Sequence, residues 1–414
     1  MTRRRKIALW LSLAVVLATV ISLRWVLAPA TLVPNVLAMA GRSLGLDITA
    51  SGIGDYRLRG TPQLVARDVV ARLPGDGAVV LRAERIFISL PWSTLRARGS
   101  ELNAHRVELD APVLDIAALQ QWLATRPASQ SPIPTLSKGI GIVRGLVLGD
   151  GWKIDNLQAQ LQSLAPDQPL RMQVAGRYVS EGLRVPVDVH ATLTRPGSGA
   201  GVGIAGNLSL QATDWRLPSR ILLSAKLLTG NGIELRNAVL GASSRYVSGN
   251  NVQPFSLGIA GPLRFADNRI SLQPAGLSIL GKDMIPTLDA SGDFALAEEL
   301  RLHLDGTLAS WPAAWPALPP PLGQSSSPLP FTLGYAGAVD MSAVAALRVQ
   351  RDASAFDGRF RVPEMMGWID AAADGSPLPP VSGTVRSPRM EVSGAVLEGV
   401  ELQLDDPAIP AAGE

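Results

Sequence analysis

The chain has 414 residues, of which 47% are hydrophobic and only 18% are charged, and its formal net charge is +3. This weak basic balance, without a run of Lys and Arg after residue 6, argues against nucleic acid as a partner. The sequence contains no cysteine, which excludes disulfides, thiolate metal sites and a cysteine nucleophile.

Residues 1–30 combine a basic tip with an uncharged apolar run. Four consecutive cations end at Lys6, and the run extends from residue 7 to residue 23. This length is at the lower limit for crossing a bilayer, and the preceding charges place the N-terminus in the cytoplasm and the remainder across the membrane. We therefore predict one transmembrane anchor; a signal peptide cleaved near residues 28–30 is the alternative. The residues expected to contact the membrane are Trp10, Leu11, Val15, Val16, Val20 and Trp25.

Two proline-rich segments divide the rest of the chain. Residues 126–139 and 311–330 are expected to be linkers, because proline cannot donate a hydrogen bond to a sheet ladder. They separate an N-terminal region (31–125), a central region (140–310) and a C-terminal region (331–414). Short helices are predicted at 31–45 and 116–124.

Most of the remaining sequence alternates between apolar and polar residues. In residues 183–193 every odd position is apolar and the even positions are mostly polar, so one face of the predicted strand is wholly apolar. Similar patterns occur at 107–113, 170–174, 300–305, 390–396 and 400–405. One-sided alternation is typical of antiparallel sheet. The few helices could not cover every strand, which argues against a doubly wound α/β fold. We predict a mainly β protein.

No catalytic or metal-binding pattern emerges from the sequence. His105, His190 and His303 are far apart and lack metal-ligand spacing. Residues 201–206 (GVGIAG) match the dinucleotide fingerprint, but the required strand before them and helix after them are not predicted. We therefore predict neither a cofactor nor an enzymatic activity.

Two blocks of the sequence resemble a known family. Residues 46–123 include VVLRAERIFISLPWSTL and LNAHRVELDAPVLDIAALQQWL, and residues 373–404 run ADGSPLPPVSGTVRSPRMEVSGAVLEGVELQL. They resemble the N-terminal and C-terminal parts of the AsmA family of bacterial envelope proteins.

The resemblance implies a repeating-β-groove lipid transfer protein, in which an elongated, curled antiparallel sheet forms an apolar groove. It implies an anchor in the inner membrane, a bulk in the periplasm and a role in moving phospholipid between the inner and outer membranes. The expected partners are membrane phospholipids, the inner membrane and outer-membrane or envelope proteins. The family offers no catalytic residue to carry over.

An apolar sheet face must be hidden from water, either against a second sheet or by bound acyl chains. The second possibility predicts a lipid groove. Two other functions stay open: a scaffold that holds envelope proteins by strand addition, and an envelope enzyme, for which the sequence shows no acid–base cluster. The residues expected to line the groove are Val107, Leu109, Leu183, Val185, Val187, Val189, Leu193, Leu302 and Leu304.

Overall fold

The structure is a computed structural model. It describes residues 37–409 except for 38–40, 43, 58–59, 76, 97–102, 126–134, 231, 267–268, 316–317, 319, 321, 371–378 and 393. The predicted anchor, including Trp10, Leu11, Val15, Val16, Val20 and Trp25, lies outside the described residues, as does most of the 126–139 linker. No helix within the described ranges has the length and apolar character needed to cross a bilayer.

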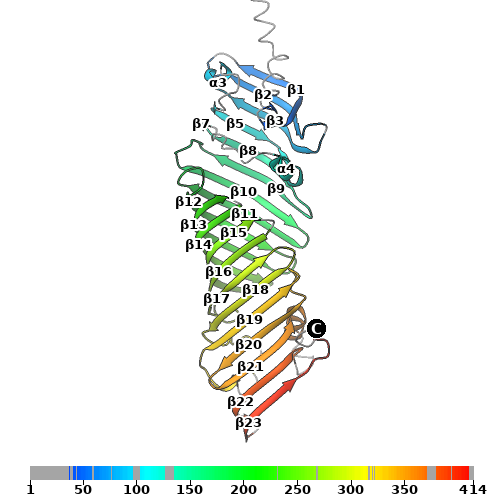
Figure 1. Cartoon of the computed structure of the whole chain (residues 1–414), viewed down its shortest axis with the longest axis vertical. Coiled ribbons are helices and arrows are strands. Elements are labelled where there is room, and N and C mark those ends of the chain that lie inside the picture. Colours follow the sequence, from blue (N-terminus) through cyan, green and yellow to red (C-terminus); the bar gives the residue numbers. More distant parts are fainter. Residues whose placement is uncertain are drawn as a thin grey trace, which may run out of the picture. The chain divides into compact units, whose positions relative to one another are not determined.

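The chain forms two compact units, residues 1–196 and 197–414. Their boundary falls inside the central region expected from the sequence (140–310). Strands dominate both units and helices are few and short, as predicted (Figure 1).

The first unit contains β1 (Asp47–Arg57), β2 (Gln63–Arg72), β3 (Val79–Ser89), α3 (Trp92–Arg96), β4 (Asn103–Ala104), β5 (Arg106–Asp110), β6 (Val113–Asp115), α4 (Ile116–Ala124), β7 (Thr135–Leu136), β8 (Ile140–Leu148), β9 (Trp152–Leu161), β10 (Leu170–Ser180) and β11 (Leu183–Leu193). Strand β11 coincides with the predicted strand at 183–193, and helix α4 coincides with the predicted helix at 116–124. Asp115, which has an extended backbone, caps the N-terminus of helix α4: its side chain accepts a hydrogen bond from the amide of Ala118 at 2.9 Å.

The sheet of the first unit is mixed, which corrects the expectation of a purely antiparallel sheet. Both β5 and β6 pair in parallel with β8, whereas the other neighbours in this sheet are antiparallel. Parallel strands require a long crossover connection. Helix α4 and the residues between it and β8 supply that connection. The short strands β4 and β7 form a separate parallel pair.

The second unit is an antiparallel meander in which each strand pairs with the next along the chain. Its elements are β12 (Gly201–Gln211), β13 (Arg216–Gly230), β14 (Gly232–Ser248), β15 (Asn251–Ala266), β16 (Arg269–Leu280), β17 (Leu288–Leu296), β18 (Leu300–Leu308), η1 (Leu322–Gln324), β19 (Leu329–Gly337), β20 (Val344–Arg351), β21 (Ser354–Arg361), α5 (Val362–Asp370), β22 (Ser382–Val392) and β23 (Ala395–Leu404).

Irregular positions lie at corresponding places on neighbouring strands of the first unit. Asp68, Ala111, Arg144 and Asn156 all have positive φ, although none is a glycine. They lie in or beside β2, β5, β8 and β9, and the register of β8 with β9 and of β9 with β10 shifts at the same level. A bulge bends its strand and increases the local twist. Aligned bulges therefore bend this sheet along one line. In the second unit, register shifts follow one another from β13 to β17.

Buried apolar side chains pack together in two clusters. The first joins Leu37 to Leu64, Ala66 and Val69 at the start of the first unit. The second joins Leu308, Leu329 and Val349 in the second unit. Much of the first unit's sheet outside its cluster is only half-buried, and that difference defines the candidate site.

Candidate functional site

One face of the first sheet carries continuous rows of apolar side chains that run across the strands. Residues directly opposite one another on paired strands lie on the same face. The Leu109 row connects seven strands in this way. Its members are Ala66, Ile86, Leu109, Ile142, Ala159, Val174 and Val189.

Two further rows flank the Leu109 row on the same face. The Val107 row consists of Leu64, Ile88, Val107, Ile140, Leu161, Met172 and Ala191. The Leu114 row, on the other side of the bulges, consists of Ala71, Leu81, Leu114, Val147, Ile154, Tyr178 and Val185. Together the three rows make the apolar face of the first unit.

The apolar face is only half-buried over most of its extent. Leu64, Ala66 and Ala71 on β2 are buried, as is Val147 on β8, but the other members of the three rows keep part of their surface accessible. A sheet packed against a second layer would bury these side chains. Within the described part of the first unit the only other sheet is the two-residue pair β4–β7.

The structure places the predicted groove residues in two groups. Val107, Leu109, Val185 and Val189 are members of the three rows, and Leu183, Val187 and Leu193 share their face because they occupy the odd positions of β11. In the second unit, Leu302 lies opposite Phe294 and Tyr335, and Leu304 lies opposite Gly292 and Leu333. Leu302 is half-buried, whereas Leu304 is only 9% exposed.

The alternation predicted for residues 107–113 is interrupted at Ala111. This residue has φ 45° and separates β5 from β6. Beyond it, Leu114 rather than Val113 lies opposite Val147 and joins the apolar face. The pattern in the sequence does not reveal the change, because an alanine at the break fits an uninterrupted strand.

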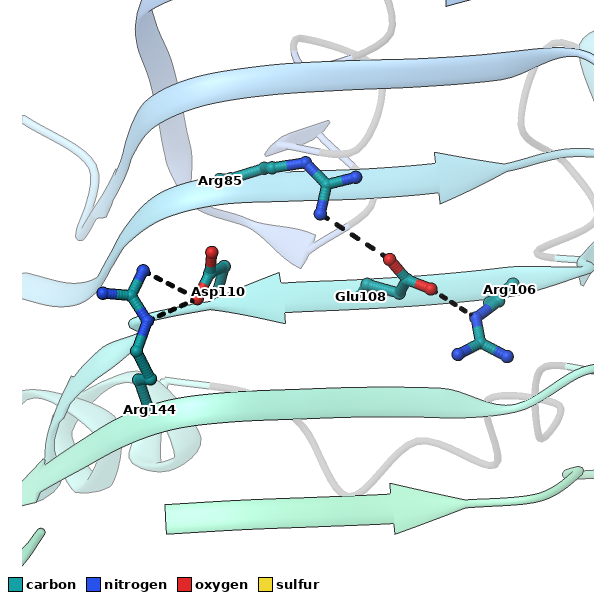
Figure 2. A network of polar contacts seen from close by, with 5 residues as sticks. All are labelled: Arg85, Arg106, Glu108, Asp110 and Arg144. Atoms are coloured by element: carbon teal, nitrogen blue, oxygen red, sulfur yellow. Dashed lines mark hydrogen bonds and ion pairs between the residues drawn. The ribbon is translucent and has the colours of Figure 1, made fainter. Parts of the chain in front are cut away.

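Ion pairs cross the opposite, polar face of the same strands. In Figure 2, Arg85 and Arg106 lie on either side of Glu108, and Arg144 points at Asp110. The Arg106–Glu108 distance is 2.6 Å, and Arg144 also reaches Glu84 at 2.7 Å. Hydrogen bonds to Glu84 and Asp110 raise the pKa of the Arg144 guanidinium. Since Arg144 lies at a bulge and bonds to two other strands, these contacts hold the irregular register of β8 in place.

A comparable pair links β9 and β10. Both Nε and Nη2 of Arg177 donate to the Asp155 carboxylate, at 2.9 and 3.0 Å. These hydrogen bonds hold the pKa of Asp155 below its ordinary value. Asp155 precedes the bulge residue Asn156, so this contact also stabilises the bend.

The apolar face is closed at its N-terminal end. Leu37 packs against Leu64, Ala66 and Val69, and Ile48, Ala50 and Ile86 pack around this cluster. The indole of Trp122 in α4 donates to the carbonyl of Leu44 at 2.8 Å, which ties α4 to the segment before β1. The more open part of the face therefore begins beyond β2.

In the second unit an apolar row crosses the twelve strands that the structure describes. The burial of its side chains changes from strand to strand. From β12 to β16 its members are half-buried, whereas Val349 and Val385 are buried and Leu402, on the last strand, is 49% exposed. The Ile204 row consists of Ile204, Leu223, Leu240, Ile259, Leu277, Ala290, Gly306, Phe331, Val349, Phe356, Val385 and Leu402.

The proline-rich segment between β18 and β19 accounts for much of the added cover. We call residues 309–328 the strap. Its Trp311 and Leu318 pack against the cluster of Leu308, Leu329 and Val349. Expected to be a linker, this segment does not separate two sheets, because β18 and β19 pair directly along their whole length. Its Trp311 and Leu318 lie on the apolar face instead.

The described residues show no arrangement suited to metal binding. None of them forms a group of three or more His, Asp or Glu side chains that could hold a metal ion. His105, between β4 and β5 of the first unit, contacts Ser137, and His303, on β18 of the second unit, contacts Asp305. Residues 201–206, which match the dinucleotide fingerprint, lie inside β12, and no helix follows them.

Comparison with known proteins adds no relative: no family model, curated protein or solved structure matches this chain. The function must therefore be argued from the apolar face itself.

Proposed function

We propose that the protein binds or transfers phospholipid along its apolar face. In this proposal an N-terminal anchor holds it in the bacterial inner membrane, its bulk lies in the periplasm, and it supports the lipid homeostasis of the outer membrane. The observation that carries the proposal is the half-buried state of the Val107, Leu109 and Leu114 rows. The resemblance of residues 46–123 and 373–404 to the AsmA family supports the location and the role.

The dimensions of the rows suit an acyl chain. The Val107 row crosses seven strands, and six intervals of about 4.8 Å give about 29 Å. The hydrocarbon core of a bilayer is about 30 Å thick, so a chain from one leaflet needs about 15 Å. An acyl chain lying along the row would gain about 0.8 kcal/mol for each CH₂ removed from water. Binding of this kind needs shape and apolar surface, and no specific polar group.

A photo-crosslinking amino acid at Val189 tests the proposal. The matched control is the adjacent His190, which points to the polar face of the same strand. We expect phospholipid adducts at Val189 and few at His190 in intact cells, detected by mass spectrometry of the purified adduct. Adducts at Val189 that consist only of peptides from the same chain would refute a lipid-binding face.

A second candidate function is a scaffold that captures an extended strand of an envelope protein. The observation in its favour is the edge of β23, which pairs with β22 and with no other strand among the described residues. Val396, Leu397 and Leu402 on this strand are 45–49% exposed. An unpaired edge offers free backbone donors and acceptors to another chain. Crosslinking at Leu397 would yield protein adducts if this function holds and none if it does not.

A further inference from the structure

A cation-lined pocket lies at the ends of the strands that carry the Val107 row. It has a volume of about 330 Å³ and is lined by Arg106, Ser137, Lys138, Ile140, Gln160, Leu161 and Gln162. Two of these residues, Ile140 and Leu161, face each other across β8 and β9 and belong to the Val107 row. Arg106 and Gln160 lie on the polar face of these strands, so the pocket and the Val107 row lie on opposite faces and meet at the ends of β8 and β9.

The turn before β8 fixes the position of Lys138. The Lys138 amide donates to the carbonyl of His105 at 2.6 Å, and the next residue, Gly139, has φ 70°. A Cβ at Gly139 would overlap the backbone of Leu161, so the turn lies tightly against the end of β9. The side chain of Lys138 is exposed and makes no ion pair with any residue in the described ranges. Its charge is available to a ligand.

Arg106 is the second cation of the pocket, and Glu108 is the carboxylate that competes for it. The Nε atom of Arg106 lies 2.6 Å from Oε1 of Glu108, while Arg85 lies 3.6 Å from Oε2 (Figure 2). One carboxylate thus faces Arg85 and Arg106, and Lys138 adds a third positive charge. The nearby Asp110 is engaged by Arg144. The net charge of the side chains around the pocket is therefore positive, which favours the binding of an anion.

The remaining polar groups of the pocket can donate hydrogen bonds. Gln160 and Gln162 contribute amide groups from β9 and its continuation, and Ser137 contributes a hydroxyl that lies 2.6 Å from Nδ1 of His105. Two cations with amide and hydroxyl donors around them suit an oxyanion with several acceptor oxygens. A phosphate group meets this description.

We propose that the pocket formed by Arg106, Ser137, Lys138, Gln160 and Gln162 binds a phosphate group, so that a phospholipid held there extends its acyl chains around the ends of β8 and β9 onto the Val107 row. The inference rests on the proposed function for the source of the phosphate. It adds a preference for lipids that carry phosphate to a face that by itself recognises only apolar surface.

The test uses the full chain in a maltoside detergent, with a photo-crosslinking residue at Val189 and an equimolar mixture of phosphatidylglycerol and diacylglycerol. These lipids share acyl chains, but only the first carries phosphate. We expect the wild type to yield mainly phosphatidylglycerol adducts. Lys138→Gln and Arg106→Gln should each reduce that preference about tenfold, the loss expected for one charge-assisted hydrogen bond. Inorganic phosphate should compete with phosphatidylglycerol and not with diacylglycerol.

Two variants separate binding from folding. Glu108→Gln removes the carboxylate that competes for Arg106, so it should increase the preference for phosphatidylglycerol, whereas a purely structural ion pair would give a loss. Lys153→Gln is the matched control, because Lys153 is an exposed lysine at the opposite end of β9. It should leave the preference unchanged.

The outcomes distinguish this inference from the proposed function. Equal adducts with both lipids, insensitive to Lys138→Gln, would overturn the phosphate pocket and leave the lipid-binding face intact. No lipid adduct at Val189 would overturn the function, and calorimetric titration with inorganic phosphate would then decide the pocket alone. If inorganic phosphate binds and Lys138→Gln weakens that binding, the pocket is a site for free phosphate. If inorganic phosphate does not bind, the phosphate pocket is refuted.

Discussion

Arg351 and Leu322 are joined by a hydrogen bond of 2.8 Å from Nη1 of the arginine to the backbone carbonyl of the leucine. The same nitrogen donates to the carbonyl of Ser325 at 2.6 Å, and Arg351 is only 4% exposed. The end of β20 thereby fixes the strap, and Trp315 fixes it again by donating to the carbonyl of Met284 at 2.9 Å. These hydrogen bonds hold the described parts of the strap against the sheet.

Replacing Arg351 should release the strap. Arg351→Met leaves two carbonyls without their donor, so we expect a loss of about 2–3 kcal/mol in the free energy of unfolding, measured by chemical denaturation. Limited proteolysis should then cut within residues 311–328. The control is Arg348→Met on the same strand as Arg351, which removes an exposed ion pair with Asp357 of β21. Equal effects of the two substitutions would contradict the role given to Arg351.

A charge on the apolar face should be tolerated much better than a charge in the buried cluster. Val174 is half-buried, whereas Leu329 has 0% exposure. We expect Val174→Asp to lower the free energy of unfolding by less than about 2 kcal/mol and Leu329→Asp by more than about 4 kcal/mol. Thermal and denaturant unfolding of both variants measure this difference. Similar large losses would mean that the rows form an ordinary packed interior.

The turn at Gly139 should not accept a side chain. Gly139→Ala combines a positive φ with overlap of the Leu161 backbone, so it should cost at least about 3 kcal/mol of stability. Gly182 has nearly the same φ, 71°, but open space around it. Gly182→Ala should therefore cost only about 1 kcal/mol. Denaturation midpoints of the two variants separate the effect of overlap with the Leu161 backbone from the cost of a positive φ.

The Asp155–Arg177 contact predicts a pH dependence of known sign. Because the folded pKa of Asp155 is lowered, its contribution to stability is present above the unfolded pKa and is lost as the pH falls through the folded pKa. Asp155→Asn should therefore destabilise the protein at pH about 7 and have progressively less effect toward pH about 2–3. Asp150→Asn, in the turn before β9, is the control. A stability difference that stays constant over this range would argue against the ion pair.

The sequence predicted the regular parts of the fold well. Strand β11 and helix α4 appear where the alternation at 183–193 and the helical pattern after Asp115 placed them. Both are decided by local signals: a period of two in the first case, and a capping carboxylate in the second. The apolar side of β11 also followed directly from its odd positions.

Positions decided by contacts distant in sequence were not predicted. The parallel pairing of β5 and β6 with β8 depends on a crossover, and the bend at Ala111 depends on its neighbours in the sheet. The strap resembles a linker in composition, and only the structure shows Trp311 and Leu318 packed on the sheet. The pocket beside Lys138 likewise unites residues from three separate segments, and no local motif signals it.

The antiparallel order of the strands in the second unit determines which changes in chain length keep the sheet intact. Every neighbouring pair from β12 to β23 is antiparallel and adjacent along the chain. Insertion or loss of one hairpin would keep the direction of all later strands and extend or shorten the sheet by about 10 Å. Chains built in this way can therefore differ in length by whole hairpins, and their apolar side chains remain on the same face of the sheet throughout.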